Sequence, residues 1–182
     1  MMVMAKKKRK KHMLIRWIYG IFIVPITILI IGLLIPQNLQ MPVVGANHGD
    51  YNHNTFWHQG WGRSVVHKGV DVFAKKGTVV KSSTIGIVLS TTHLGRGGKT
   101  VLILGPKWRL HYYAHLDKIT THPLALVGHN TPIGTVGNTG NAASTPAHLH
   151  YSIYTLIPYP WRIDNEPMGH LKMYYLNPID YF

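Results

Sequence analysis

The stretch PAHLHYSIY, residues 146–154, places two histidines one residue apart among apolar and aromatic neighbours. In a β-strand, side chains two positions apart point to the same face of the sheet. We therefore expect His148 and His150 to direct their imidazole rings at one place. Because an imidazole can bind a metal ion or exchange a proton near neutral pH, this pair predicts a chemically active site.

Two other segments contain residues that suit the same chemistry. The motif HKGVD holds His67 and Asp71 four positions apart, and the motif YYAHL contributes His115. The chain has no cysteine, so histidine and carboxylate side chains are the ligand types that it offers. A catalytic zinc ion usually has three protein ligands and one open position, and it lowers the pKa of bound water from about 15.7 toward 7. With further histidines to exchange protons, these residues indicate metal-assisted hydrolysis of an amide.

The combination of motifs carries this prediction, because a single strand histidine is usually a half-buried polar residue. Spacing alone does not decide whether His148 or His150 is the metal ligand. His111 alternates with His115 along one expected strand, so it is a further candidate for the site. The remaining histidines after residue 62 lie in turns and loops and are expected to be solvated: His93, His122, His129 and His170.

The segments that must position these residues read as short β-strands separated by turns. They are rich in Val, Ile, Thr and Tyr and have no helical period. They cover residues 65–74, 77–83, 84–92, 99–105, 108–116, 131–141 and 147–155. Many short strands at close spacing predict an all-β domain, a small antiparallel sheet or β-roll with a modest core. The tail, residues 156–182, is expected to be a loop and a terminal wrap.

The N-terminal part has a different composition, with a basic run directly before an apolar segment at 13–36. Residues 17–35 carry no charge, and nineteen helical residues span about the ~30 Å of a bilayer core. Pro25 is tolerated in a membrane helix. The apolar run of a signal peptide is usually roughly 7–15 residues, so the sequence favours an uncleaved transmembrane anchor over a signal peptide.

The charge distribution predicts the orientation of this anchor. The chain has 19 Lys and Arg against 6 Asp and Glu, a net charge of +13, and seven of the basic residues lie in the first sixteen positions. The positive-inside rule then leaves the N-terminus in the cytoplasm and the β domain outside. Because the densest charge abuts the apolar segment, we expect a membrane partner and no nucleic acid.

We therefore expect four regions along the chain. They are a cytoplasmic basic tail at 1–12, the anchor at 13–36, a linker at 37–62 and the β domain at 63–182. The linker is rich in Asn, Gly and His, and its histidines (His48, His53 and His58) are expected to be solvated. Because it leads straight into HKGVD, His53, His58 or a nearby Asn could instead cover the open metal position.

The motifs and their order resemble those of the lysostaphin/LytM-type zinc metallopeptidases. That family carries H-x-x-x-D, a later single His and H-x-H, and here these are HKGVD, YYAHL and HLH, within residues 63–155. The resemblance implies that His67, Asp71 and His150 bind Zn²⁺ and that His115 and His148 are the catalytic pair. It also implies a metal in a groove on one sheet, with the glycine-rich segment GNTGN at 137–141 on the groove floor.

The resemblance implies a bacterial protein whose substrates are peptidoglycan peptides. We thus predict a single-pass zinc endopeptidase of the inner (plasma) membrane that hydrolyses peptide cross-links on the periplasmic or extracytoplasmic side. In a Gram-negative cell the bond would be the D-alanyl–diaminopimelate cross-link. The alternative is a non-catalytic regulator that activates another cell-wall hydrolase, but such relatives typically lack some metal ligands, and all three are present here. The sequence predicts neither the cleaved bond nor the oligomeric state.

Overall fold

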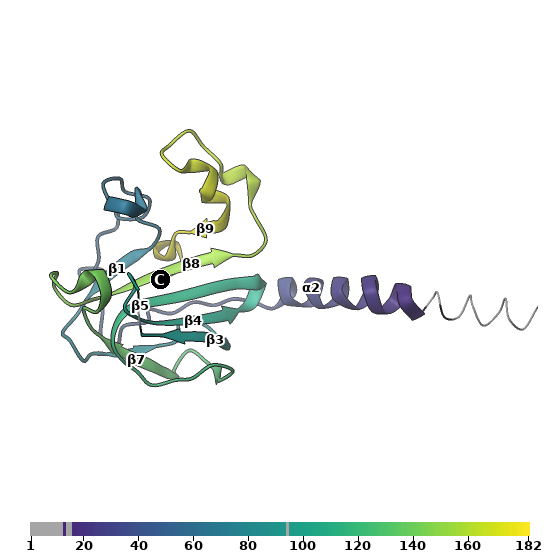
Figure 1. Cartoon of the computed structure of the whole chain (residues 1–182), viewed down its shortest axis with the longest axis horizontal. Helices are drawn as coiled ribbons and strands as arrows, with labels where there is room; N and C mark the ends of the chain where they lie inside the picture. Colours follow the sequence, from purple (N-terminus) through teal and green to yellow (C-terminus); the bar gives the residue numbers. More distant parts are fainter. Residues whose placement is uncertain (1–12, 14–15, 94) are drawn as a thin grey trace, which may run out of the picture. The chain divides into compact units, whose positions relative to one another are not determined.

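A computed structural model describes residue 13, residues 16–93 and residues 95–182. The described residues form two compact units that divide after Ile35. The basic run at 6–11 lies outside the described residues. Figure 1 labels the elements of both units.

In the described part of the first unit, an apolar helix, Arg16–Leu34, is long and apolar enough to cross a membrane. It contains a π-helical turn, Tyr19–Ile23, followed by the α-helix α2, Val24–Leu34. Pro25 explains this turn, because proline has no N–H to donate to the carbonyl four residues earlier. The amide of Val24 donates instead to the carbonyl of Tyr19, five residues back.

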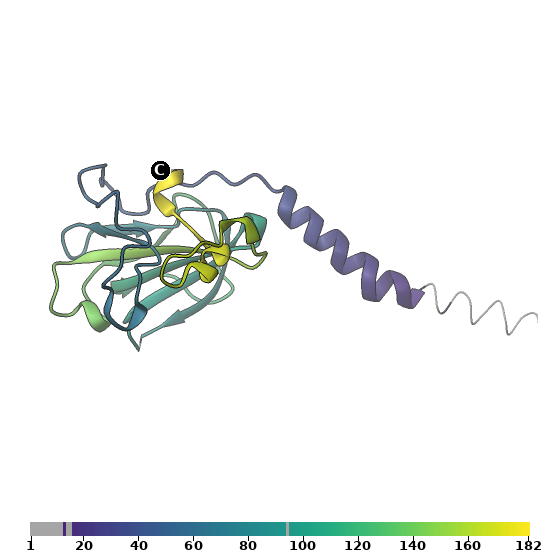
Figure 2. The same cartoon turned by 90° about the horizontal axis from the view of Figure 1, so that it is seen from above.

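The second unit is a nine-stranded antiparallel sheet within the described residues, which confirms the all-β prediction. Its main path runs β1-β8-β5-β4-β3-β6, with β7 pairing β5 and β2, and β9 pairing β8. The strands are β1 Val70–Phe73, β2 Val79–Lys81, β3 Gly86–Thr92, β4 Lys99–Gly105, β5 Arg109–Ile119, β6 Leu126–Val127, β7 Pro132–Val136, β8 His148–Thr155 and β9 Tyr175–Leu176. Short 3₁₀ helices connect them: Gly62–Ser64, Pro106–Trp108, Gly140–Ala142, Pro160–Arg162, Gly169–Tyr174 and Pro178–Tyr181. Figures 1 and 2 show β8 and β5 running side by side through the sheet.

Alternation along the central strands separates a core face from a polar face. On β8, Leu149, Tyr151 and Ile153 are fully buried in the hydrophobic core. Since successive strand residues point to opposite faces, His148 and His150 lie on the other face of the same strand. One side of β8 thus stabilises the domain while its other side carries the candidate chemistry.

Residues 37–62, which the sequence suggests as a linker, pack onto the domain instead. Leu39, Val43, Tyr51 and Trp57 are buried, and the first three belong to the hydrophobic core. Val43 forms a β-bridge with Val80, and Tyr51 forms one with Val72. Single bridges impose no periodicity on the sequence, so the segment reads as polar and irregular although it covers the sheet.

Candidate active site

The pairing of β1 with β8 brings the two main motifs together. Asp71 on β1 lies directly opposite His150 on β8, and His67 precedes β1 in the same HKGVD segment. Gly69 makes this approach possible, because a Cβ at its position would lie 2.5 Å from both Ser152 Oγ and the Tyr151 carbonyl oxygen. The packed segment at 37–62 also holds this motif, since His67 N donates to the His58 carbonyl at 2.9 Å.

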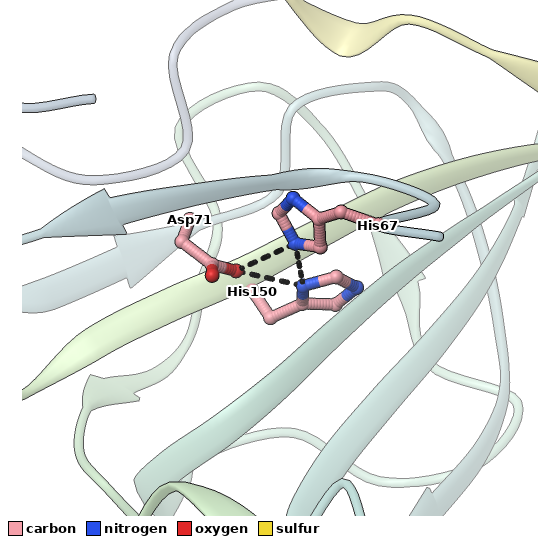
Figure 3. Close-up of side chains that lie close together, drawn as sticks. All are labelled: His67, Asp71 and His150. Atoms are coloured by element: carbon pink, nitrogen blue, oxygen red, sulfur yellow. Dashed lines mark hydrogen bonds and ion pairs between the residues drawn. The ribbon is translucent and has the colours of Figure 1, made fainter. Parts of the chain in front are cut away.

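Three side-chain atoms converge at this point (Figure 3). His67 Nε2 lies 3.0 Å from His150 Nδ1 and 3.1 Å from Asp71 Oδ1, and His150 Nδ1 lies 2.8 Å from the same Oδ1. His67 is almost fully buried, whereas the side chains of Asp71 and His150 are 15% and 18% exposed. In the part of the chain that the structure describes, no other group of three His, Cys, Asp or Glu converges this way.

In both rings, the nitrogen that points away from the converging group, Nδ1 of His67 and Nε2 of His150, has a hydrogen-bond partner of its own. This leaves His67 Nε2 and His150 Nδ1 as acceptors. His67 Nδ1 lies 2.8 Å from Thr55 Oγ1 and 3.2 Å from the Thr55 carbonyl oxygen; the carbonyl can only accept and the hydroxyl can also accept, so a proton on Nδ1 serves both oxygens. His150 Nε2 lies 2.9 Å from Ser152 Oγ, to which it can donate. With these tautomers, three acceptor atoms face each other, an arrangement that a bound cation would complete.

The donor set fits zinc. Two imidazole nitrogens and a carboxylate oxygen are ordinary zinc ligands with bonds of about 2.0–2.2 Å. Tetrahedral bonds of that length place ligand atoms roughly 3.3–3.5 Å apart, only a few tenths of an ångström beyond the edges of this triangle. The residues His67, Asp71 and His150 can therefore hold the ion with little movement.

Electrostatics favour a charged Asp71 carboxylate and a neutral His150 ring at this site. Burial alone would raise the pKa of Asp71, but hydrogen bonds and charge from the adjoining rings of His150 and His67, when these rings carry a proton toward the carboxylate, hold it well below its ordinary value. Burial lowers the pKa of His150, despite the opposing effect of Asp71. An ionised Asp71 and a neutral His150 are the protonation states that metal binding needs.

His115 reaches the polar face because β5 contains a β-bulge. The register between β4 and β5 shifts between Lys99 and Val101, and His115 adopts a left-handed φ of 62° there. The bulge breaks the alternation from which the sequence placed His111 and His115 on one face. The His115 ring centroid consequently lies 5.1 Å from that of His148 and 6.0 Å from that of His150.

The rings of His115 and His148 are oriented alike. His115 Nδ1 donates to the Thr139 carbonyl at 2.9 Å, and His148 Nδ1 donates to the Pro146 carbonyl at 2.8 Å. In the neutral form of each ring, the proton is therefore on Nδ1 and Nε2 is the acceptor. Burial, with a contribution from His150, lowers the pKa of His115 to about 4, so this ring is neutral at pH 7 and can accept a proton.

His111, by contrast, belongs to a separate buried cluster. It lies opposite Ile153 rather than beside His150, and its Nδ1 is 2.7 Å from the Tyr151 hydroxyl. Its Nε2 lies 3.1 Å from Gln37 Nε2. The structure therefore does not bring His111 to the metal-ligand group.

A pocket of about 210 Å³ opens over the site. His67, His150 and His115 lie in its wall, and the other lining residues include Trp61, Lys68, Arg96, Tyr112, Asn141 and Ser152. Lys68 and Arg96 give the pocket two positive side chains, and burial together with the Arg96 charge lowers the pKa of Lys68. A positively charged rim suits a substrate that carries carboxylates.

The segment at 37–62 covers part of the site through Trp61, not through His53 or His58. The Trp61 ring stacks on His67 with centroids 4.1 Å apart, and His53 Nε2 instead donates to the His48 carbonyl. Thr55, Trp61 and Ser152 were not singled out from the sequence. Ser152 follows the same alternation as His148 and His150, so this signal could have revealed it.

Comparisons with known proteins agree with this geometry. The model of peptidase family M23 matches residues 65–165. The L-Ala–D-Glu endopeptidase of Bacillus subtilis (strain 168) is 34% identical over 116 residues, which cover 58% of this chain and 35% of that protein. The chain thus spans about a third of the length of this curated relative.

Two solved structures show the same fold. A zinc-containing peptidase from Vibrio cholerae has a TM-score of 0.54 and 27% identity, covering 65% of this chain and 36% of that chain. The catalytic domain of the antimicrobial peptidase lysostaphin from Staphylococcus simulans has a TM-score of 0.58 and 21% identity, covering 73% of this chain and 92% of that chain. The second likeness, at this identity, concerns the fold alone.

Proposed function

The chain belongs to peptidase family M23, and we propose from this premise that it is a membrane-anchored zinc endopeptidase acting on peptidoglycan peptides. The observation that carries the proposal is the convergence of three acceptor atoms, from His67, Asp71 and His150, within 3.1 Å of one another. The B. subtilis relative is named an L-Ala–D-Glu endopeptidase, and the V. cholerae neighbour is named a zinc-containing peptidase. Both support this substrate and this metal.

In the proposed reaction, His67, Asp71 and His150 hold the metal, and His115 and His148 handle the protons. A bound zinc ion would polarise the scissile carbonyl and lower the pKa of water. The Nε2 atoms of His115 and His148 lie on the same side of β8 as the ligands and are free to accept a proton from the attacking water. The protonated ring then returns that proton to the leaving nitrogen as the C–N bond breaks, so the products are a carboxylate and an amine.

The surroundings of the two rings suit this exchange. The carbonyls of Thr139 and Pro146 fix the ring orientations, because each accepts a hydrogen bond from Nδ1. Burial keeps His115 neutral, and the same burial makes its protonated form short-lived, which favours return of the proton to the product amine. Tyr112, whose ring lies 6.4 Å from that of His150, lines the pocket where the substrate carbonyl would enter.

We further propose that the helix Arg16–Leu34 anchors the protein, with the second unit outside the cytoplasm. The basic residues that precede the helix support this orientation by the positive-inside rule. A peptidoglycan substrate requires the same placement. The test is protease protection of the full chain in intact cells and spheroplasts, where the second unit should be cleaved only from outside.

The catalytic proposal is tested by incubating the zinc-loaded full chain with purified sacculi and analysing released fragments by mass spectrometry. We expect new amino termini from peptide cleavage, and none from the Asp71→Ala chain. The masses also decide between a D-alanyl–diaminopimelate cross-link and an L-Ala–D-Glu bond of the kind for which the B. subtilis relative is named. A chain that binds zinc but releases nothing under any condition would instead be a non-catalytic regulator.

A further inference from the structure

Several large apolar side chains are exposed in the loop that follows β8. Trp161 is 78% exposed, Leu156 is 55% exposed and Ile163 is 49% exposed. Exposed apolar side chains that cluster at one place mark a surface that contacts something other than water. Arg162 lies between two of them and adds a positive charge to this loop.

A chain of contacts joins this loop to the first residues of the second unit. Arg109 Nη1 donates to Gln37 Oε1, and Arg109 Nη2 donates to the Tyr159 hydroxyl at 3.3 Å. The Tyr159 ring stacks on Trp161 with centroids 5.1 Å apart. Gln37, the buried Arg109, Tyr159 and the exposed Trp161 therefore form one continuous chain of contacts at the end of β8.

The length of the chain ties this end of the domain to the apolar helix. Helix α2 ends at Leu34, and only Ile35 and Pro36 precede Gln37. Three Cα–Cα steps of ~3.8 Å reach at most about 11 Å. If the helix spans a membrane, Gln37 and the residues that hold it cannot lie far from the bilayer surface.

A second group of exposed apolar residues lies at the same end of the sheet. Leu124 is 75% exposed and Leu126 is 82% exposed. Strand pairing aligns Tyr154, Leu110, Leu104, Ile87 and Leu126 in one row across β8, β5, β4, β3 and β6. At about 4.8 Å per strand, the row places Leu126 roughly 19 Å from Tyr154 across the sheet. The exposed apolar residues after β8 and those beside β6 therefore lie at two separate places along the same end of the sheet.

We propose that these two groups form a docking rim, consisting of Leu156, Trp161, Ile163, Leu124 and Leu126, that contacts the lipid headgroup region. The inference rests on the proposed anchoring, because the apolar helix brings the rim to the bilayer. Tryptophan is enriched at membrane interfaces, and Arg162, next to Trp161, adds a positive charge that complements anionic lipids.

Docking would also fix the position of the candidate active site. Asp71, His150 and Ala114 form a register row four residues along β8 from Tyr154. At about 3.3 Å per residue, this row lies roughly 13 Å farther from the rim along the strands. The pocket would thus be held at a set height above the membrane, where it could act on the peptidoglycan nearest to the bilayer.

The absence of cysteine from the natural chain gives a direct test. Single cysteines are introduced as Trp161→Cys and Leu126→Cys, with Ser144→Cys as the matched control in the exposed loop before β8. Each full chain is labelled with a nitroxide and reconstituted into vesicles of phosphatidylethanolamine and phosphatidylglycerol. Relaxation by oxygen, which concentrates in lipid, is compared with relaxation by a water-soluble nickel complex.

We expect the oxygen-to-nickel ratio to be severalfold higher at positions 161 and 126 than at 144. If the full chain resists alkaline carbonate extraction but all three labels are equally open to nickel, the docking rim is wrong and the anchoring stands. If carbonate releases the chain, the anchoring itself fails. Spin–spin broadening at position 161 would show that a second copy covers the rim, which also overturns lipid docking.

Discussion

Two polar clusters, one where β1 pairs with β8 and one where β5 pairs with β8, differ in whether they contain their own positive charge. Around His150, two rings and a carboxylate present acceptors to one another. Around His111, the guanidinium of Arg109 lies in the cluster, donates to Gln37 and to Tyr159, and sits 5.4 Å from the centre of the Tyr181 ring. The donor set of the first cluster suits an added cation, whereas the second cluster already contains the Arg109 guanidinium.

This difference explains why burial of a histidine does not by itself indicate a metal site. Both His111 and His67 are almost fully buried and hydrogen-bonded. Burying a charge without a partner costs several kcal/mol, so an added cation would stabilise the Asp71 carboxylate, whereas the Arg109 guanidinium already has hydrogen-bond acceptors and an aromatic ring around it. A second cation is not tolerated beside Arg109, and burial together with this charge lowers the pKa of His111 to about 3.

The largest expected effect tests the comparison directly. Asp71→Ala or His150→Ala should abolish stoichiometric zinc binding and reduce hydrolysis of sacculi by at least about 10³-fold, because the zinc site loses a ligand. The matched control is His111→Ala, which removes an equally buried ring from the other cluster. That variant should keep its zinc and lose roughly 2–4 kcal/mol of folding free energy. Mass spectrometry of the full chain measures its zinc content, and chemical unfolding measures its folding free energy. Loss of zinc from the His111→Ala control would contradict the distinction between the two clusters.

A smaller loss is expected when the metal remains but proton transfer fails. His148→Ala and His115→Ala should each lower the rate of cleavage by about 10²–10⁴-fold, since general acid–base catalysis contributes in that range. Zinc content should not change, because neither ring belongs to the converging group of three. Normal cleavage by the His115→Ala chain would remove His115 from the proposed mechanism.

The sequence predicted the part of the site that depends on local patterns. Alternation along β8 placed His148 and His150 on one face, and the order of the motifs pointed to His67 and Asp71. The same alternation failed on β5, because a bulge at His115 inserts a residue that no local pattern announces. The alternation of side chains between the two faces of a sheet holds only where the hydrogen bonds between neighbouring strands are regular.

The fold class was also predictable from short strands and turn residues, but the packing of residues 37–62 over the site was not. Thr55 and Trp61 come from a segment in which single apolar residues contact the sheet through isolated bridges. Such contacts join residues far apart in the chain and leave no periodic pattern. The role of Gln37 beside Arg109 is hidden for the same reason, since 72 residues separate them.

The two clusters should also respond differently to acid, and the His111 cluster gives the clearer signal. The pKa of His111 is about 3 in the folded chain against an ordinary value of 6.5. Between these values the unfolded chain binds a proton that the folded chain does not, so stability falls as pH drops from about 6.5 toward 3, by up to about 1.4 kcal/mol per pH unit. The variant His111→Gln should show a flatter dependence. Unfolding of both full chains in excess chelator measures the difference, and equal slopes would exclude His111 as the cause.

The smallest effect concerns the residue that orients a ligand without touching the metal. Ser152→Ala removes the partner of His150 Nε2, so the ring can turn or adopt the other tautomer. We expect zinc affinity to fall by about 10–100-fold, with activity restored at high zinc concentration, because the three ligand atoms themselves remain. Thr155→Ser, a mild change at a buried position farther along the same strand, is the matched control and should leave zinc affinity unchanged. Competition with a fluorescent chelator measures both affinities. If Ser152→Ala binds zinc as tightly as the parent chain, the orientation of His150 is set by β8 and Asp71 alone, and the acceptor geometry of the site is more rigid than its hydrogen bonds suggest.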